Sequence, residues 1–374
     1  MNAWVYAKPL SIVFSTCRGV MWVKEKPSFR PRPLLREALW CLANGQPLRP
    51  GEGDGDALRR MLFHVQGCRE GRFRTVPSAG ATYPLEVYVS SRGEVFRLER
   101  GLYRYVPCGG GLSRVGGDAG FEGFVLTAFP GRTTTYYGER GYRYVRMELG
   151  HALQNLFLSI YSHGLAGSVE LVDYEFRAGS AEYVLARVAV SRPAGYCAGF
   201  ALEKGLPLDD VVAARRSVRN YARASLGLEA LDSIMKWSMG EVVEGARPYP
   251  KLGGGYAVEG YVVATSVKGV EKGLYRFNSS ELELELVRVG EFAEKLWRAA
   301  LMQGSVRKAP AVVVLTGRGP LAEVEVGAVG QNIYLNAVHE GLGTVAIGAF
   351  EDEEVSSILE VEDPLYLMPV GKPA

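Results

Sequence analysis

The sequence predicts an α+β fold that occurs twice in the chain, with helices packed on a mostly antiparallel sheet in each half. Two observations support this expectation. Short segments of the first half return in the second half, in the same order and at a nearly constant separation. Helical and strand-like segments also mix without the regular alternation that is typical of a parallel sheet. The length of 374 residues exceeds the usual size of a single domain, which agrees with two halves.

The internal repeat is carried by three pairs of segments. Residues 101–105 (Gly-Leu-Tyr-Arg-Tyr) return 172 residues later as 273–277 (Gly-Leu-Tyr-Arg-Phe). Residues 154–158 and 162–165 return 177 residues later, at 331–335 and 339–342. A fainter copy of residues 77–86 stands at 250–259. We therefore predict a tandem duplication joined near residues 191–204, with an N-terminal half at 1–197 and a C-terminal half at 198–374.

Corresponding elements are expected in the two halves. Apolar spacing predicts two helices near the start of each half, at residues 34–42 and 56–65 and again at 208–214 and 228–239. Strands are expected at 87–89 and 261–264, long amphipathic helices at 146–162 and 324–339, and closing β-rich runs at 183–190 and 366–370.

Composition excludes several classes of protein. Apolar residues make up 47% and charged residues 22% of the chain, as in ordinary globular proteins. The formal net charge of +2 gives no reason to expect a nucleic-acid or membrane partner, and no run of eighteen apolar residues occurs. Charged residues interrupt the N-terminal stretch, which argues against a signal peptide. The five cysteines and four histidines are scattered, so we expect a cytoplasmic protein with neither metal site nor disulfide framework.

Residues 73–89 begin as a loop and end as a strand. Pro77 suits a rigid entry to a turn, and the small residues Ser78, Ala79 and Gly80 allow the backbone to lie against a flat ligand. From Leu85 the residues become typical of a strand. A plain turn before a strand is the alternative interpretation of this composition.

Residues 77–88 (Pro-Ser-Ala-Gly-Ala-Thr-Tyr-Pro-Leu-Glu-Val-Tyr) resemble the flavin-facing loop of SagB-type dehydrogenases. These belong to the nitroreductase superfamily of FMN enzymes and include azoline oxidases. The resemblance implies FMN as the cofactor. Single-domain members are homodimers that place two FMN molecules at the subunit interface, so a duplicated chain would reproduce that dimer internally, as a pseudo-two-fold pair.

A second match is residues 214–221 (Ala-Arg-Arg-Ser-Val-Arg-Asn-Tyr). Three arginines within five residues offer planar donor forks that suit a phosphate or the edge of a flavin, although a solvated basic turn has the same composition. The resemblance implies that Arg215 and Ser217 hold the FMN phosphate and ribityl chain, with Arg216 in support. It places Arg219 near flavin N1 and O2, where a cation stabilises the reduced ring.

Each half has lost a different part of the site. No arginine stands at residues 42–46 of the first half, which correspond to the arginine segment. In the second copy of the loop, Lys251 replaces Ser78 and Leu252 replaces Ala79. In the dimeric family the arginines and the loop come from different subunits. We therefore expect one complete site, which combines the arginines of the second half with the loop of the first.

Two segments near the C-terminus complete the expected site. Residues 341–350 resemble the family segment that brings backbone N–H groups near flavin N5 and O4, which points to Ile347 and Gly348. Residues 369–373 resemble the closing Gly-Lys of the family, whose lysine reaches the phosphate. Lys372 is therefore a second candidate for phosphate binding, and an ordinary solvated tail residue is the alternative.

A third match, residues 132–144 followed by Glu-Leu-Gly-His at 148–151, bears on the chemistry. The resemblance implies that in azoline oxidases a Lys-Tyr pair in this segment assists proton removal. This chain has Tyr136 in place of the lysine and keeps Tyr137, and tyrosine is a weak base at neutral pH. Tyr136 and Tyr137 are the catalytic candidates, and strand packing is the alternative role of this aromatic cluster. We expect His151 to be an interface residue.

The expected function is that of an FMN-dependent oxidoreductase that transfers hydride through flavin N5 at one site between the halves, with NADH or NADPH as electron donor. Its substrate would be a small molecule or a modified peptide. Dehydrogenation of azoline peptides is one alternative. A flavin-binding or structural protein whose catalysis has decayed is another.

Overall fold

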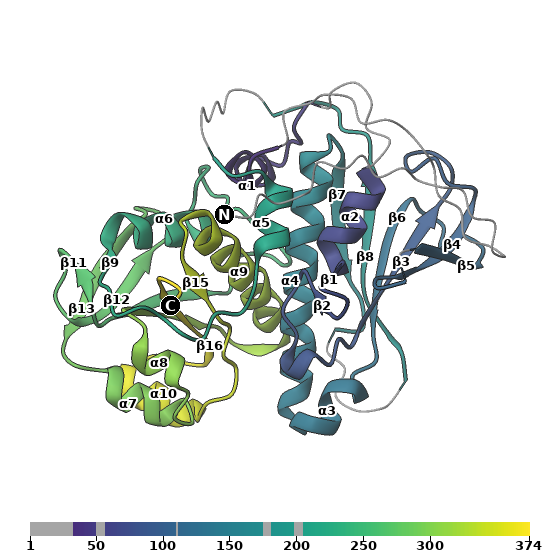
Figure 1. Cartoon of the computed structure of the whole chain (residues 1–374). Helices are drawn as coiled ribbons and strands as arrows, with labels where there is room; N and C mark the ends of the chain where they lie inside the picture. The colour runs from purple at the N-terminus through teal and green to yellow at the C-terminus, as the bar shows by residue number, and fades with distance from the viewer. Residues whose placement is uncertain (1–32, 50–56, 110, 175–180, 198–204) are drawn as a thin grey trace.

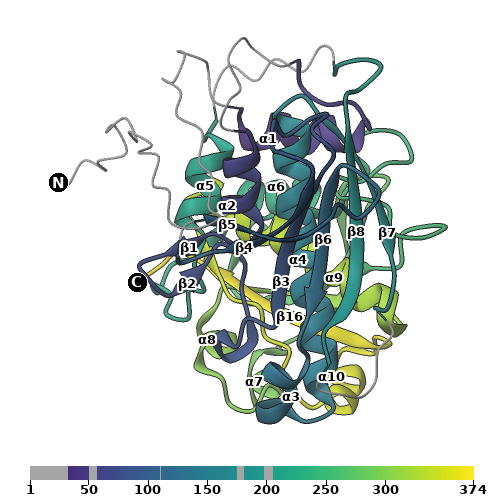
Figure 2. The ribbon, with the colours of Figure 1, turned by 90° about the vertical axis from the view of Figure 1, so that its right-hand side faces the viewer.

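The computed structural model describes residues 33–49, 57–109, 111–174, 181–197 and 205–374. Two six-stranded antiparallel sheets lie on opposite sides of two long, central helices, α4 (Arg140–Ser162) and α9 (Gly319–His339). Figure 1 shows these helices side by side, and Figure 2 shows the first sheet in front of α4.

The two sheets share one topology. The first has the order β5-β4-β3-β6-β8-β7 and the second β13-β12-β10-β14-β16-β15, so each strand of one half has a counterpart in the other. The strands of the first sheet are β3 (Leu85–Ser91), β4 (Gly101–Val106), β5 (Gly111–Gly116), β6 (Gly123–Ala128), β7 (Ala166–Leu171) and β8 (Tyr183–Ser191). Those of the second are β10 (Glu259–Ala264), β12 (Gly273–Asn278), β13 (Glu283–Val289), β14 (Ala311–Thr316), β15 (Gly343–Thr344) and β16 (Pro364–Gly371). The predicted α+β fold with two similar halves is confirmed.

The short helices also correspond. The expected pairs are α1 (Leu35–Ala43) with α5 (Leu208–Ala214) and α2 (Ala57–Gln66) with α6 (Leu228–Met239). Each half then has elements of its own. These are α3 (Gly131–Tyr137) and the hairpin β1 (Cys68–Arg69) and β2 (Phe73–Arg74) in the first, and α7 (Ala293–Ala299), α8 (Gly304–Lys308), α10 (Asp352–Leu359), β9 (Leu226–Gly227) and β11 (Val267–Lys268) in the second.

The two central helices cross at a pair of glycines related by the repeat. A Cβ atom on Gly150 would lie 1.8 Å from the carbonyl oxygen of Val324, and one on Gly327 would lie 2.0 Å from that of Met147. No side chain fits at either position, so the two backbones are in direct contact where the halves meet.

Side chains beside this crossing exchange matched hydrogen bonds. Gln154 Nε2 donates to Asn332 Oδ1 at 2.6 Å, and Gln331 Nε2 donates to Asn155 Oδ1 at 2.8 Å. These are two copies of one contact, as expected where a pseudo-two-fold axis relates the helices. His151 shares a 2.9 Å hydrogen bond with Gln331, and burial lowers its pKa to about 3. His151 is thus a neutral residue of the seam between the halves, as expected.

Three predictions need correction. The long helices are not amphipathic, because residues 144–162 and 324–337 are all buried between the two sheets. Residues 131–137 and 140–144 are helical, so the aromatic cluster does not pack as a strand. Disulfides are present: Cys41 is bonded to Cys197 and Cys68 to Cys108, with Cα atoms 5.6 and 5.0 Å apart. Cys17 lies outside the described residues.

Most of the predicted join, and the charged N-terminal stretch, lie outside the described residues. The boundary between residues 197 and 198 therefore stays a prediction. No helix in the described part of the chain is long and apolar enough to span a membrane.

Candidate active site

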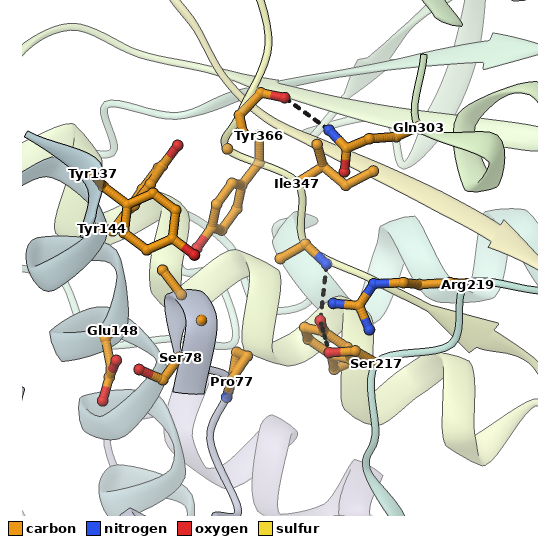
Figure 3. A pocket seen from close by; sticks show the side chains of 16 residues that line it. Pro77, Ser78, Tyr137, Tyr144, Glu148, Ser217, Arg219, Gln303, Ile347 and Tyr366 are labelled. Carbon is orange, nitrogen blue, oxygen red and sulfur yellow. Dashed lines mark hydrogen bonds between the residues drawn. The ribbon is translucent and has the colours of Figure 1, made fainter. Parts of the chain in front are cut away.

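A cavity of about 170 Å³ lies between the two halves (Figure 3). Both halves contribute to its wall. From the first half come Pro77, Ser78, Ala79, Gly80, Tyr137, Tyr144 and Glu148; from the second come Ser217, Arg219, Gln303, Tyr334, Ala346, Ile347, Gly348, Ala349 and Tyr366.

The small-residue loop forms one side of the cavity. The Ser78 hydroxyl accepts a hydrogen bond from the Tyr83 N–H at 2.9 Å, and a short 3-10 turn spans Ala79–Ala81 before β3. Gly80 has a φ of +58°, and a Cβ atom there would lie 2.7 Å from the Tyr137 hydroxyl. Both the positive φ and the close contact with Tyr137 require a glycine at this position. The loop therefore holds Tyr137 against the cavity.

Arg215 ties this loop to the second half. Its side chain is buried; Nε donates to the Thr75 carbonyl oxygen at 2.7 Å and Nη2 to that of Arg74 at 3.2 Å. The guanidinium lies over the Tyr334 ring, 4.9 Å from its centroid. Burial lowers its pKa to about 10, and Nη1 has no hydrogen-bond partner among the described residues. A cation of the second half thus orients the loop of the first.

The opposite wall is built on residues 346–350. The N–H of Ala346 donates to the Tyr334 hydroxyl at 2.8 Å, and that hydroxyl is 3.0 Å from Ser217 Oγ. The N–H of Ile347 is used by the Leu367 carbonyl oxygen, whereas the N–H of Gly348 has no partner in the described part of the chain. Gly348 therefore has a backbone N–H that is free to donate to a ligand, whereas the N–H of Ile347 is already used within the protein.

Close packing keeps this wall in place. A Cβ atom on Gly348 would lie 2.6 Å from the Tyr144 ring. Arg140 of the first half donates to the carbonyl oxygens of Gly348 and Phe350 at 3.1 and 2.6 Å and pairs with Asp352 at 2.9 Å. The wall from the second half is therefore held by an arginine of the first, so the cavity depends on the contact between the halves.

Glu148 is the one carboxylate that lines the cavity. It lies on α4 beside Ser78 and is 3% exposed. Gln66 Nε2 donates to its Oε1 at 3.3 Å. Burial raises the pKa of Glu148 to about 7, against the opposing effects of the polar Ser78 and Gln66 side chains and of the charges on Arg74 and Arg132.

The cavity brings together most of the predicted site residues. Nine line it: Pro77, Ser78, Ala79, Gly80, Tyr137, Ser217, Arg219, Ile347 and Gly348. Arg215 lies behind its wall. Tyr136 is 76% exposed and, with the exposed Arg216 and Lys372, lies outside the lining. The structure therefore does not place Tyr136 where it could contact a ligand in this cavity.

Besides Ala346 and Ala349, which flank the predicted Ile347 and Gly348, five lining residues were not predicted: Tyr144, Glu148, Gln303, Tyr334 and Tyr366. Glu148 and Tyr144 stand in the third sequence match, and Tyr334 stands in the repeat, so the sequence held a signal for these three. Gln303 directly precedes α8, a helix that has no counterpart in the first half, and carries no such signal.

The corresponding glutamate of the second half has a different environment. Glu325 stands 177 residues after Glu148, on α9. It accepts hydrogen bonds from the Tyr249 hydroxyl at 3.0 Å and from the N–H groups of Ala257 and Val258 at 2.9 and 3.3 Å. Tyr249 is itself fully buried. Three protein donors therefore bind Glu325, and the tyrosine occupies the space beside it.

Comparison with known proteins identifies the family. The Nitroreductase family matches residues 212–372. A protein of Methanocaldococcus jannaschii named as a nitroreductase is 37% identical over 181 residues, which are 45% of this chain and 91% of that protein. The chain belongs to the nitroreductase family. It is accordingly an oxidoreductase.

One solved structure shows the same fold over most of its length. A nitroreductase from Anabaena variabilis superimposes with a TM-score of 0.72 and covers 93% of both chains at 20% identity. Its coverage shows that the likeness includes both halves of the present chain. A nitroreductase from Ralstonia eutropha matches 47% of this chain and 88% of its own, with a TM-score of 0.40 and 22% identity.

Proposed function

We propose that this nitroreductase-family protein is an FMN-dependent oxidoreductase of the SagB type with a single composite site. One observation carries the proposal: the cavity combines the small-residue loop at residues 77–80 with Ser217, Arg219 and Gly348 of the other half. Nitroreductase-family proteins generally bind a flavin and use a reduced nicotinamide cofactor.

The donors around the cavity fit an anionic, planar cofactor. Arg219 lines the cavity and forms no ion pair with any described residue, and buried Arg215 behind the wall likewise has no carboxylate partner there. A phosphate would compensate these charges. The free N–H of Gly348 suits an acceptor atom at the edge of a ring. Pro77 and Ala79 offer an apolar surface for its face.

FMN, when bound, supplies two-electron chemistry between a reduced nicotinamide donor, NADH or NADPH, and a small-molecule acceptor. The residues of this chain bind and orient it: Ser217 and Arg219 at its polar parts and the loop against the ring. Tyr137, Tyr144 and Tyr366 reduce the access of water on the remaining side (Figure 3). Because NADH and NADPH are intracellular, we propose a cytoplasmic location, where disulfides such as these occur mainly in heat-adapted microbes.

The environment of Glu325 supports a single site. Tyr249 and two backbone N–H groups bind its carboxylate, and Lys251 and Leu252 stand where the first loop has serine and alanine. At the corresponding place in the second half, larger side chains and internal hydrogen bonds thus replace the small residues that border the cavity.

The two alternatives receive less support. An azoline oxidase would use a lysine where this chain has Tyr136, and that tyrosine faces solvent. A decayed structural protein would have no use for Arg219, which lines the cavity and forms no ion pair with any described residue.

The test is the FMN content of purified protein, measured per chain after denaturation, in two matched variants. We expect about one FMN per chain, loss of FMN in Ser78→Trp, and retention in Lys251→Trp, which places the same bulk at the corresponding position of the other half. Two FMN molecules per chain would contradict the single site. No binding after FMN is added to the wild type would contradict the function.

A further inference from the structure

The buried carboxyl group of Glu148 has too few partners for a purely structural residue. It is 3% exposed, lines the cavity and, among the described residues, has no cation within ion-pair distance. The hydrogen-bond partner that the structure shows for it is the neutral amide of Gln66. A buried carboxylate is normally paired with a cation or bound by several donors, so this one is poorly compensated.

Charged and titratable groups around Glu148 come from several elements. Arg74 of β2 donates to Gln66 Oε1 at 2.9 Å and forms no ion pair with Glu148, so that its charge acts on the carboxylate only from a distance. Arg132 of α3 pairs with Glu86, 2.7 Å away. Tyr366 of β16 and Tyr144 of α4 line the same cavity. None of these neutralises the carboxylate directly, which is why burial dominates its pKa.

Glu325 provides an internal comparison for Glu148. The two glutamates occupy corresponding positions on α4 and α9. Three donors hold Glu325, two of them backbone N–H groups that require an acceptor, so its role is structural. Within the described residues Glu148 accepts no backbone N–H, and the neighbouring Ser78 belongs to the cavity wall. The glutamate at this position of the repeat is thus a structural hydrogen-bond acceptor in the second half, whereas in the first half it faces the cavity.

We propose that Glu148 is the acid–base residue of this cavity, an inference that rests on the proposed function. In the two-electron reduction of an acceptor, the reduced nicotinamide gives one hydride, which carries two electrons and one proton. The second proton leaves the protonated carboxyl of Glu148 for the acceptor, and the resulting carboxylate takes a proton from solvent. The acceptor thus gains two electrons and two protons, and the nicotinamide is oxidised. With a pKa of about 7, the carboxyl is present in both forms at neutral pH, as a proton donor requires.

The variants Glu148→Gln and Glu325→Gln, made in the full chain, test this role. Reduction by NADPH is measured with a quinone, which takes up two protons, and with ferricyanide, which takes up none. We expect Glu148→Gln to lower the ratio of quinone to ferricyanide rate about 100-fold, the usual contribution of general acid catalysis. Glu325→Gln leaves that ratio unchanged. An unchanged ratio in Glu148→Gln would overturn the proposal.

A second measurement does not depend on the reaction. The carbonyl stretch of the protonated carboxyl, followed by infrared spectroscopy from pH 5 to 9 in protein without FMN, reports Glu148 itself. We expect a component that titrates near pH 7 and is absent from Glu148→Gln. Absence of this component from the wild type would overturn the proposal. Absence of FMN binding would instead refute the proposed function.

Discussion

Replacing Gly150 by alanine tests how the two halves are joined. The added Cβ would lie 1.8 Å from the Val324 carbonyl oxygen, whereas a carbon–oxygen contact ordinarily measures about 3.3 Å. The helices α4 and α9 would therefore have to separate by about 1.5 Å at their crossing, the difference between these two distances. That shift stretches the matched hydrogen bonds from Gln154 to Asn332 and from Gln331 to Asn155.

The cost follows from these contacts. Overpacking costs about 1–3 kcal/mol, and the two buried hydrogen bonds about 1–1.5 kcal/mol each. The higher helix propensity of alanine offsets about 1 kcal/mol of this cost. We expect the free energy of unfolding to fall by about 2–5 kcal/mol, with loss of bound FMN because the cavity spans the same seam.

Urea unfolding followed by tryptophan fluorescence measures this change. The control is Gly116→Ala on the exposed edge strand β5, where a Cβ atom would meet nothing within 4 Å. We expect that variant to stay within about 1 kcal/mol of the wild type. A Gly150→Ala protein as stable as this control, with its FMN retained, would refute the direct backbone contact between the halves.

Three further predictions concern single interactions. Arg219→Ala should weaken FMN binding by about 10- to 100-fold in a fluorescence titration, as expected for a charge-assisted hydrogen bond, and an unchanged affinity would exclude the contact. Burial acts to raise the pKa of Asp209, but the hydrogen bond and charge of His64 outweigh it and lower the pKa. Its stabilisation is therefore present above about pH 4 and lost as the pH falls below it, so Asp209→Asn should flatten the acid limb of stability against pH. Breaking the bond between Cys68 and Cys108, which closes a separation of 40 residues, should cost about 4 kcal/mol, seen as a lower midpoint in urea.

Local patterns in the sequence determined much of this protein. The repeat predicted two similar halves, and the structure shows the same strand order in both sheets. The resemblance to SagB-type dehydrogenases assigned the loop at 77–80 and the segment at 215–219 to the site. Their small side chains and clustered arginines, visible in the chain itself, agree with that assignment but also fit ordinary turns. Nine of the residues that these motifs and the resemblance pointed to line one cavity.

Only the tertiary structure decided the properties that depend on neighbours far along the chain. Arg215 turned out to be buried against the Thr75 carbonyl, and Tyr136 faces solvent, although both stand in matching motifs. The partner of Cys41 is 156 residues away, a pairing that no spacing rule predicts. Glu148 and Glu325 have equivalent places in the repeat, yet one faces a cavity and the other binds backbone N–H groups. Burial and hydrogen bonding set the pKa of a carboxyl group, and both arise only when the two halves pack together.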